Sequence, residues 1–169
     1  MVIIILLLAL ATSAQEVNPE HFCKSSFDFQ FKPESKPQNR EHLFDYCRDH
    51  AANTCCQLHQ VDMIRKRVEA MPTNDKCKFV SSQVFCANCD SDIGTDQRQG
   101  ICQHVCDVWY DACQYSSYCQ EPHFDNCPSG GQQLYWITPN STDFCERMGY
   151  PVNTDNSKCW DGIPTAHKV

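Results

Sequence analysis

The residues with the clearest potential for chemistry are Cys86 and Cys89, which form a Cys-x-x-Cys motif. Thiol–disulfide oxidoreductases use this spacing, and together with Cys102 and Cys106 the pair also imitates the ligand spacing of a zinc site. A redox motif needs an electropositive setting that lowers the thiol pKa, whereas Asp90 follows this motif at once and its charge raises that pKa. In cysteine-dense secreted chains such pairs are mostly structural disulfides. We therefore predict neither a redox centre nor a zinc site.

The seven histidines are scattered along the chain without the spacing of a metal site. His104 lies between Cys102 and Cys106, which favours a structural or surface role. No nucleophile motif such as Gly-x-Ser-x-Gly occurs, and no pair of carboxylates stands out from a turn context. The sequence therefore predicts no catalytic residue, no metal and no cofactor, and we expect a protein that is not an enzyme.

All 14 cysteines lie between Cys23 and Cys159. They are preceded by an apolar run that ends in small residues near Ala14, which is too short for a membrane span and is typical of a secretory signal peptide. We expect residues 1–14 to be removed and residues 15–169 to form one cysteine-rich domain. An even number of cysteines in a secreted chain predicts seven disulfides and no spare thiol.

The formal charge of −7 argues against binding to nucleic acid or to acidic lipid surfaces. No hydrophobic tail follows Trp160, so we expect no membrane anchor and a secreted, extracellular monomer. Asn140-Ser-Thr142 is a glycosylation sequon, which predicts a surface glycan on Asn140. Asn53-Thr-Cys55 is a much poorer acceptor for a glycan.

The stretch from Arg98 to Cys119 lacks proline and predicts a central helix. At 100° per residue, Cys102, Cys106 and Cys113 fall on one narrow stripe, and Trp109 lies on a neighbouring apolar stripe. Three thiols that face the core from one helix suggest a central helix to which several other segments are linked by disulfides.

Around this helix we expect a small, disulfide-rich α+β fold that is mainly helical and has a few short strands. An extended N-terminal arm pinned by Cys23 should lay the alternating residues Phe27, Phe29 and Phe31 on the core. Further expected elements are a helix from Arg40, a helix capped by Thr54 and ended by Pro72, a short extended pair over 77–89, and a short helix over 142–148. Within the second of these helices, Arg65-Lys66-Arg67 predicts a solvated face, with a phosphate or partner site as the alternative.

One segment resembles the signature helix of the folate receptor / riboflavin-binding protein family. It reads Gly100-Ile-Cys-x3-Cys-Asp-Val-Trp-Tyr-Asp-Ala-Cys-x-Tyr-Ser-Ser-Tyr-Cys119. The resemblance runs from Cys23 to Trp160 and includes the adjacent pair Cys55-Cys56, the block from Cys77 to Cys86 and the ending from Ile137 to Cys159.

Proteins of this family are non-catalytic, mainly helical and rich in disulfides. They bind a flat heteroaromatic vitamin in an open cleft or have adopted protein partners, as in egg-surface gamete receptors and the hedgehog-interacting protein. The resemblance therefore implies a folate receptor-like fold and a binding function. The disulfides it implies are Cys23–Cys55, Cys47–Cys86, Cys56–Cys89, Cys77–Cys113, Cys102–Cys159, Cys106–Cys145 and Cys119–Cys127.

The chain departs from the folate receptors where they hold the pterin. Their pterin-gripping aspartate lies two residues before the cysteine that matches Cys86, and that position is Val84 here. Their stretch with arginine and tryptophan is reduced to 90–101, and their tryptophan-rich loop is replaced by 120–126, which contains no tryptophan. Each unpaired buried polar group of a pterin would cost about 1–3 kcal/mol, so we expect negligible binding of folate.

Two classes of function remain open from the sequence. The first is an extracellular carrier of a small, vitamin-like heteroaromatic ligand, with a cleft floored by Val84 and Phe85 and walled by Tyr110, Tyr135 or Trp136. The alternative is an adhesion or signalling module that binds an extracellular protein. The supply of aromatic residues favours the first class and the shortened loops favour the second, while a filled cleft would decide for the protein partner.

Overall fold

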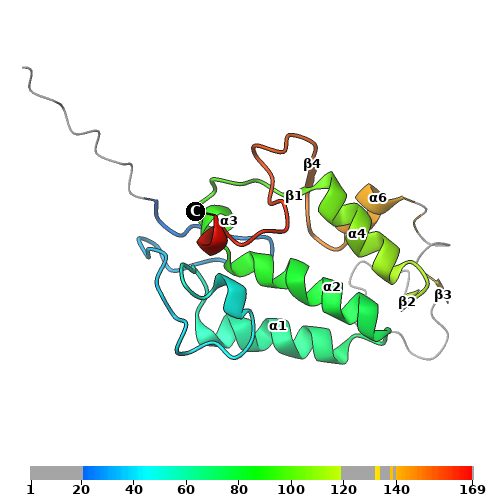
Figure 1. Cartoon of the computed structure of the whole chain (residues 1–169), viewed down its shortest axis with the longest axis horizontal. Helices are drawn as coiled ribbons and strands as arrows, with labels where there is room; N and C mark the ends of the chain where they lie inside the picture. The colour runs from blue at the N-terminus through cyan, green and yellow to red at the C-terminus, as the bar shows by residue number, and fades with distance from the viewer. Residues whose placement is uncertain (1–20, 119–131, 134–137, 139, 169) are drawn as a thin grey trace, which may run out of the picture.

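The computed structural model describes residues 21–118, 132–133, 138 and 140–168 (Figure 1). The α-helices in these ranges are α1 (Leu58–Ala70), α2 (Asp75–Cys86), α3 (Ser91–Gly94), α4 (Gln103–Cys113) and α6 (Ser141–Arg147). Three short 3-10 helices accompany them: η1 (Arg48–His50), η2 (Ala87–Cys89) and η3 (Thr165–His167). Within the same ranges, no helix has the length and apolarity to cross a bilayer.

The strands that the structure describes are two residues long. Strand β1 (Ile101–Cys102) pairs in parallel with β4 (Val152–Asn153), and β2 (Ser117–Tyr118) pairs antiparallel with β3 (Gln132–Gln133). Such short ladders contribute few hydrogen bonds, so the fold depends on helix packing and on disulfides. The protein is small, mainly helical and disulfide-rich, as the sequence predicts.

Helix α4 lies beside α2 and α6, and α1 packs on the other side of α2 (Figure 1). The three cysteines of the predicted stripe are fully buried, and each is bridged to a different segment. Their bridges are Cys102–Cys159, Cys106–Cys145 and Cys77–Cys113. The prediction of a central helix to which other segments are bridged is therefore confirmed.

Three further disulfides tie the first half of the chain together: Cys23–Cys55, Cys47–Cys86 and Cys56–Cys89. The six pairs are the same as six of the seven that the family resemblance implies. The seventh, Cys119–Cys127, lies outside the described residues. No cysteine in the described ranges is free, and the two thiols of the Cys-x-x-Cys motif are bonded to two different segments instead of to each other.

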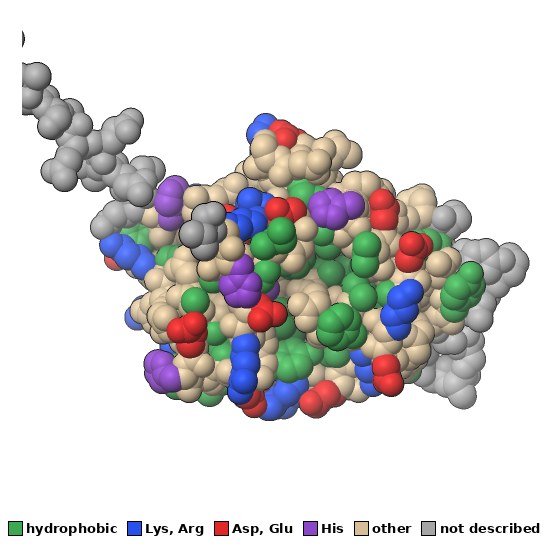
Figure 2. All heavy atoms as spheres, in the orientation of Figure 1, with side chains coloured by type: hydrophobic (Ala, Val, Ile, Leu, Met, Phe, Trp, Pro, Cys, Tyr) green, Lys and Arg blue, Asp and Glu red, His purple; other side chains and the backbone are tan. Residues whose placement is uncertain are grey.

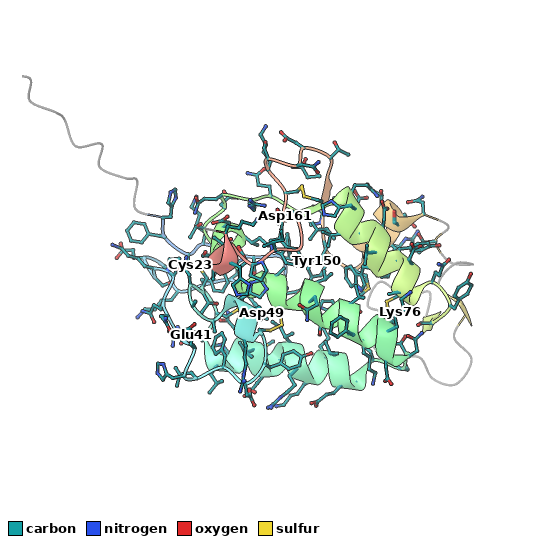
Figure 3. All side chains as sticks on the ribbon, in the orientation of Figure 1. Cys23, Glu41, Asp49, Lys76, Tyr150 and Asp161 are labelled. Carbon is teal, nitrogen blue, oxygen red and sulfur yellow. A yellow bond between two sulfur atoms is a disulfide. The ribbon has the colours of Figure 1, made fainter. Side chains whose placement is uncertain are left out.

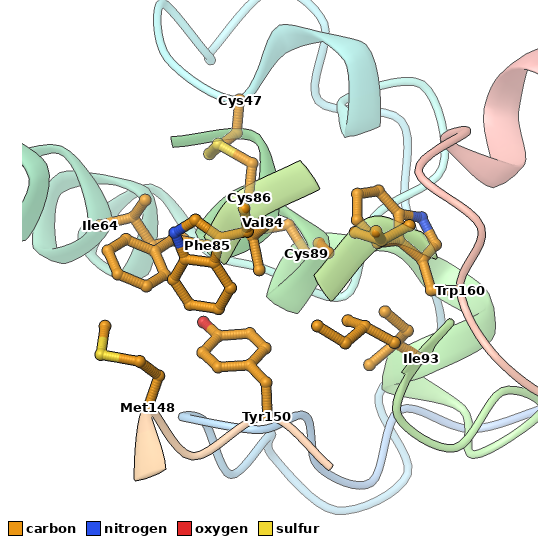
Figure 4. Close-up of a cluster of buried hydrophobic side chains, with 14 of the residues drawn as sticks. Cys47, Ile64, Val84, Phe85, Cys86, Cys89, Ile93, Met148, Tyr150 and Trp160 are labelled. Atoms are coloured by element: carbon orange, nitrogen blue, oxygen red, sulfur yellow. A yellow bond between two sulfur atoms is a disulfide. The ribbon is translucent and has the colours of Figure 1, made fainter. Parts of the chain in front are cut away.

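A cluster of aromatic rings fills the space between α2, α4 and α6. The ring of Trp109 lies 5.6 Å from Phe85, 4.9 Å from Phe144 and 5.3 Å from Tyr150, with edge-to-face geometry in each pair. The Trp109 Nε1–H donates to Ser81 Oγ of α2 at 2.8 Å, so its polar atom is paired. Figure 4 shows Tyr150 pointing toward Phe85 and Val84 within this cluster.

The expected extended pair over 77–89 is wrong, because this segment forms α2 and η2. Asn74 caps the helix by accepting a hydrogen bond from the Cys77 N–H at 2.9 Å. The buried residues of α2 recur at helical spacing: Cys77, Ser81, Val84, Phe85 and Cys86. The adjacent residues Phe79 and Val80 resemble a strand core, but Phe79 is 67% exposed.

The expected helix from Arg40 is also wrong, since turns precede the short η1 there and Cys47 adopts a left-handed conformation with φ of 54°. The second expected helix exists as α1 and ends before Pro72, but its cap is Gln57, whose N–H donates to Gln60 Oε1 at 2.8 Å. Thr54 is buried instead and donates to the Cys89 carbonyl at 2.7 Å. The short helix expected over 142–148 is confirmed as α6.

Peptide mapping of the unreduced protein is expected to recover Cys47 linked to Cys86 and Cys56 linked to Cys89. The Cα atoms of these pairs lie 5.2 and 4.9 Å apart, within the range that a disulfide spans. A thiol reagent added to the denatured, unreduced protein should label essentially no cysteine, with a reduced sample as the positive control. A peptide in which Cys86 is bonded to Cys89 would contradict this connectivity and restore the redox interpretation.

Candidate functional site

The two residues expected to floor a cleft lie inside the core. Val84 and Phe85 belong to α2 and are each 1% exposed. Phe85 packs against Trp109 and lies 5.9 Å from the ring of Tyr150. Neither residue lines the pockets described below. The floor predicted from the family pattern is thus filled by the protein's own side chains.

The expected wall residues are only partly placed by the structure. Tyr110 lies on α4, is partly buried, and donates its hydroxyl to the Thr138 carbonyl at 2.8 Å. Its ring is 5.8 Å from Phe144, so it reaches the same aromatic cluster as Phe85. Tyr135 and Trp136 lie outside the described residues. The structure therefore connects Phe85 and Tyr110 through the core without placing them around a cleft.

An open pocket of about 440 Å³ lies between the N-terminal arm and strand β4. Phe27, Ile93 and Val152 supply its apolar lining. Gly100 also borders it, with φ of 86°, and a Cβ there would lie 2.4 Å from the Pro151 carbonyl oxygen, so only glycine fits. The volume is within the range of small-ligand sites.

The arginine beside this pocket is already engaged by the protein. Arg98 donates from Nη1 to the Cys159 carbonyl at 2.7 Å and from Nε to Asp92 at 3.2 Å. Its Nη1 also lies 3.6 Å from an oxygen of Asp161. Because two carboxylates and a carbonyl satisfy the guanidinium, Arg98 holds the C-terminal segment against the α3–β1 loop and does not present an unpaired charge to the pocket.

His50, Asp90 and Thr165 lie close together, and their residue types are those of a hydrolase catalytic triad. His50 Nδ1 lies 3.2 Å from Asp90 Oδ2, and the Thr165 hydroxyl donates to Asp90 Oδ1 at 2.5 Å. The Thr165 N–H donates to the other oxygen of Asp90 at 2.8 Å. In a hydrolase triad the hydroxyl bonds to the histidine, whereas here it bonds to the carboxylate. His50 and Asp90 are 3% and 1% exposed, so the cluster fixes the C-terminal tail to the core.

Burial alone would raise the pKa of the Asp90 carboxyl, but hydrogen bonds from His50 and Thr165, together with the charge of His50, outweigh burial and hold it below its usual value. The ionised carboxylate is therefore favoured by folding. A lowered folded pKa contributes stability above the unfolded value of about 3.9, and this contribution is lost as the pH falls through the folded value.

A second, partly buried polar cluster joins the N-terminal arm to the core. Asp28 of the arm meets Arg67 of α1, Asn88 of η2 and Tyr150, which follows α6. The sequence did not predict it, because its members come from four separate segments and Arg67 was assigned to a solvated face. Among the described residues, no group of three or more His, Cys, Asp or Glu side chains is arranged to hold a metal ion.

The two sequons have different surroundings. Asn140 is exposed at the N-cap of α6, where its Oδ1 accepts from the Asp143 N–H at 2.8 Å. A glycan is attached through Nδ2, so this cap is compatible with glycosylation. Asn53 uses its Nδ2 to donate to Ser91 Oγ at 2.9 Å, and Cys55, the third residue of its sequon, is bonded to Cys23.

Replacing Asp90 by Asn is expected to lower the free energy of unfolding at pH 7 by about 1–3 kcal/mol, because charge-assisted hydrogen bonds to a buried carboxylate are lost. The difference from the unmodified protein should shrink as the pH falls below about 3.9, the unfolded pKa, and through the lower pKa of the folded Asp90 carboxyl. Denaturant unfolding at a series of pH values measures this. Glu146→Gln, at an exposed residue of α6, is the control and should leave unfolding unchanged. A difference for Asp90→Asn that persists undiminished at low pH would contradict the assignment.

Protein secreted from a eukaryotic host is expected to carry an N-glycan on Asn140 and none on Asn53, for the reasons of exposure and hydrogen bonding given above. Mass spectrometry of glycopeptides before and after enzymatic removal of the glycan tests this site by site. Asn140→Gln should remove the mass increment, whereas Asn53→Gln should leave it. Full occupancy of Asn53 would show that the backbone around Thr54 opens.

Comparison with known proteins gives limited information on identity. No protein-family model matches the chain. A relative is the HIPL2 protein of Arabidopsis thaliana, which is 24% identical over 152 residues that make up 76% of this chain. The chain spans 22% of the length of that relative. Identity at this level transfers neither a ligand nor an activity.

Proposed function

We propose that the protein is a secreted, non-catalytic binding module with a folate receptor-like fold, and that its ligand is an extracellular protein. The resemblance of the cysteine pattern and of the α4 sequence to the folate receptor / riboflavin-binding protein family supports the fold. The six disulfides of the described residues are paired as that resemblance implies.

The observation that carries the choice of ligand is the burial of Val84. At this position the resemblance implies the aspartate that holds a pterin, but Val84 is 1% exposed and belongs to the filled core. A pterin there would have to displace packed side chains and would find no partner for its polar ring atoms. The shortened segment over 90–101 removes further donors. A vitamin of this type is therefore disfavoured, because it would displace packed side chains and because its polar ring atoms would lack hydrogen-bond partners.

The surface offers apolar side chains for a protein partner. Phe79 of α2, Val108 of α4 and Tyr115, just after α4, are 67%, 58% and 68% exposed. Hydrophobic side chains gather over α2 and α4 on the face seen in Figure 2. The disulfide between Cys77 and Cys113 holds these two helices together, so the face is rigid before binding, which lowers the entropic cost of association.

Charge indicates what kind of protein fits this face. Helix α4 exposes Asp107 and Asp111 and contains no lysine or arginine. The whole chain carries a formal charge of −7. Complementary potentials steer association and select partners. Because α2 carries Lys76 and Lys78 beside Phe79, we infer a partner whose contact surface is basic where it meets α4 and acidic where it meets α2. Exposed aromatic residues such as Phe79 and Tyr115 are the side chains that most often anchor such contacts.

A small vitamin-like ligand is the second candidate, favoured by the pocket of about 440 Å³ beside β4. The two candidates differ in what should accompany the protein from its natural source. Native mass spectrometry distinguishes a stoichiometric small-molecule adduct from a complex with another protein.

The protein-partner proposal predicts no vitamin adduct and no measurable heat of binding with folic acid at neutral pH. Val84→Asp should not create folate binding, and it should destabilise the protein by several kcal/mol because a carboxylate is placed unpaired in the core. The complex with the partner recovered from the source should be lost with Phe79→Asp. Met63→Asp, at a residue that is 57% exposed on α1, is the matched control and should retain the complex. Submicromolar folate binding or a stoichiometric vitamin adduct would overturn the proposal.

A further inference from the structure

Three hydrogen-bond donors converge on one carboxylate oxygen of the N-terminal arm. Asp28 Oδ2 accepts from Tyr150 OH at 2.8 Å, from Arg67 Nη1 at 3.0 Å and from Asn88 Nδ2 at 3.1 Å. The three donors, which we call the carboxylate socket, come from α1, from η2 and from the segment after α6. Charge-assisted hydrogen bonds to a carboxylate, above all from arginine, are among the strong interactions by which proteins bind carboxylate ligands.

The carboxylate socket is held rigidly by the core. Asn88 and Tyr150 are fully buried, and Figure 3 shows Tyr150 at the centre of the molecule. The guanidinium of Arg67 lies 4.2 Å from the centre of the Phe85 ring, which orients it by a cation–π contact. Burial, reinforced by the neighbouring Asp28 carboxylate, raises the pKa of Tyr150 well above its usual value, so the phenol keeps its proton and remains a donor.

The arm occupies this site in the way a ligand would. The ring of Phe27 lies 4.7 Å from that of Tyr150, while the Asp28 N–H donates to Asn88 Oδ1 at 2.9 Å. The same Asn88 oxygen accepts from the Ser26 hydroxyl at 2.8 Å. An aromatic ring, a backbone N–H and a carboxylate are thus recognised together by groups that belong to the rest of the fold.

The occupied site is open to solvent on one side. The side chains of Asp28 and Arg67 keep 29% and 27% of their surface exposed. Phe27 is half-buried and also lines the open pocket of about 440 Å³ beside β4. The covalent anchor of the arm is Cys23–Cys55, which lies before Ser26, so the contacts of residues 26–28 can be exchanged without breaking a disulfide.

We propose that Arg67, Asn88 and Tyr150 form a binding site for a ligand that carries a carboxylate next to an aromatic ring, and that Phe27 and Asp28 occupy this site in the free protein. The ligand enters from the pocket beside β4 and replaces the ring of Phe27 and the carboxylate of Asp28. Arg67 and Tyr150 select the negative charge, and Asn88 selects an N–H next to it. This site is separate from the face of α2 and α4 and does not depend on the function proposed above.

The ligand chemistry is found both in peptide segments and in small aromatic acids, and two probes separate these sources. N-acetyl-Phe-Asp-amide carries the ring, the N–H and the carboxylate, whereas 3-phenylpropionate lacks the N–H that Asn88 Oδ1 would accept. Tighter binding of the peptide indicates a peptide source, and equal or tighter binding of 3-phenylpropionate indicates a small acid.

The test uses the disulfide-bonded protein with Phe27→Ala and Asp28→Ala combined, which empties the site. Calorimetric titration should show saturable binding of at least one of the two probes to this variant. The unmodified protein should bind the same probe about tenfold or more weakly, because its own arm competes. The uncharged analogue N-acetyl-Phe-Asn-amide should bind the variant about tenfold or more weakly than the aspartate probe, since charge-assisted hydrogen bonds to the carboxylate are missing.

Two controls establish that the probe occupies the socket. Adding Tyr150→Phe to the emptied variant should weaken binding, whereas adding Asp143→Ala, which breaks the surface ion pair with Arg147 on α6, should leave binding unchanged. Circular dichroism confirms that each variant is folded. Absence of saturable binding of both probes to a folded, emptied variant, or equal binding of the Asp and Asn probes, would overturn the proposal. Equal affinity of the unmodified and emptied proteins would also overturn it, because the probe would then lie elsewhere.

Discussion

The convergence of three disulfides on helix α4 and its N-cap residue Cys102 is the constraint on which the rest of the structure depends. The bridged pairs are Cys77–Cys113, Cys106–Cys145 and Cys102–Cys159, with sequence separations of 36, 39 and 57 residues. Closing loops of this length removes conformational entropy from the unfolded chain, typically by about 3–4 kcal/mol for each bridge. Strands of two residues cannot position α2, α6 and the C-terminal segment against one another, so these bridges and the packing around Trp109 do so.

The two ends of the described chain are held by polar contacts to one short stretch, Asn88 to Asp90. Asn88 accepts a hydrogen bond from the Asp28 N–H of the arm, and Asp90 accepts one from the Thr165 N–H of the tail. Cys89, which lies between them, is bonded to Cys56. All three residues of the stretch are almost fully buried. Hydrogen bonds in such an environment are strong when complete and costly when a partner is missing, so this stretch specifies where both ends of the chain lie.

The sequence predicts the parts of the fold whose signal is local and periodic. Helix α4 follows from the spacing of its buried residues, whereas α2 is missed because Phe79 and Val80 resemble a strand and the cap at Asn74 is overlooked. The carboxylate socket has no local pattern, since Asp28 and Tyr150 lie 122 residues apart. Its members meet only because α1, η2 and the segment after α6 pack together, and this tertiary placement cannot be obtained from spacing along one element.

A protein that carries a polar vitamin has to present polar groups in its cleft that are paired only with water until the vitamin arrives. The position that would bear such a group holds Val84, which needs no partner and fills the core. The carboxylate socket, which does need a partner, receives one from Asp28. Neither of these two positions therefore awaits a ligand. The two proposed routes of recognition, on the exposed faces of α2 and α4 or by exchange of the arm, both leave the disulfide-bonded core unchanged.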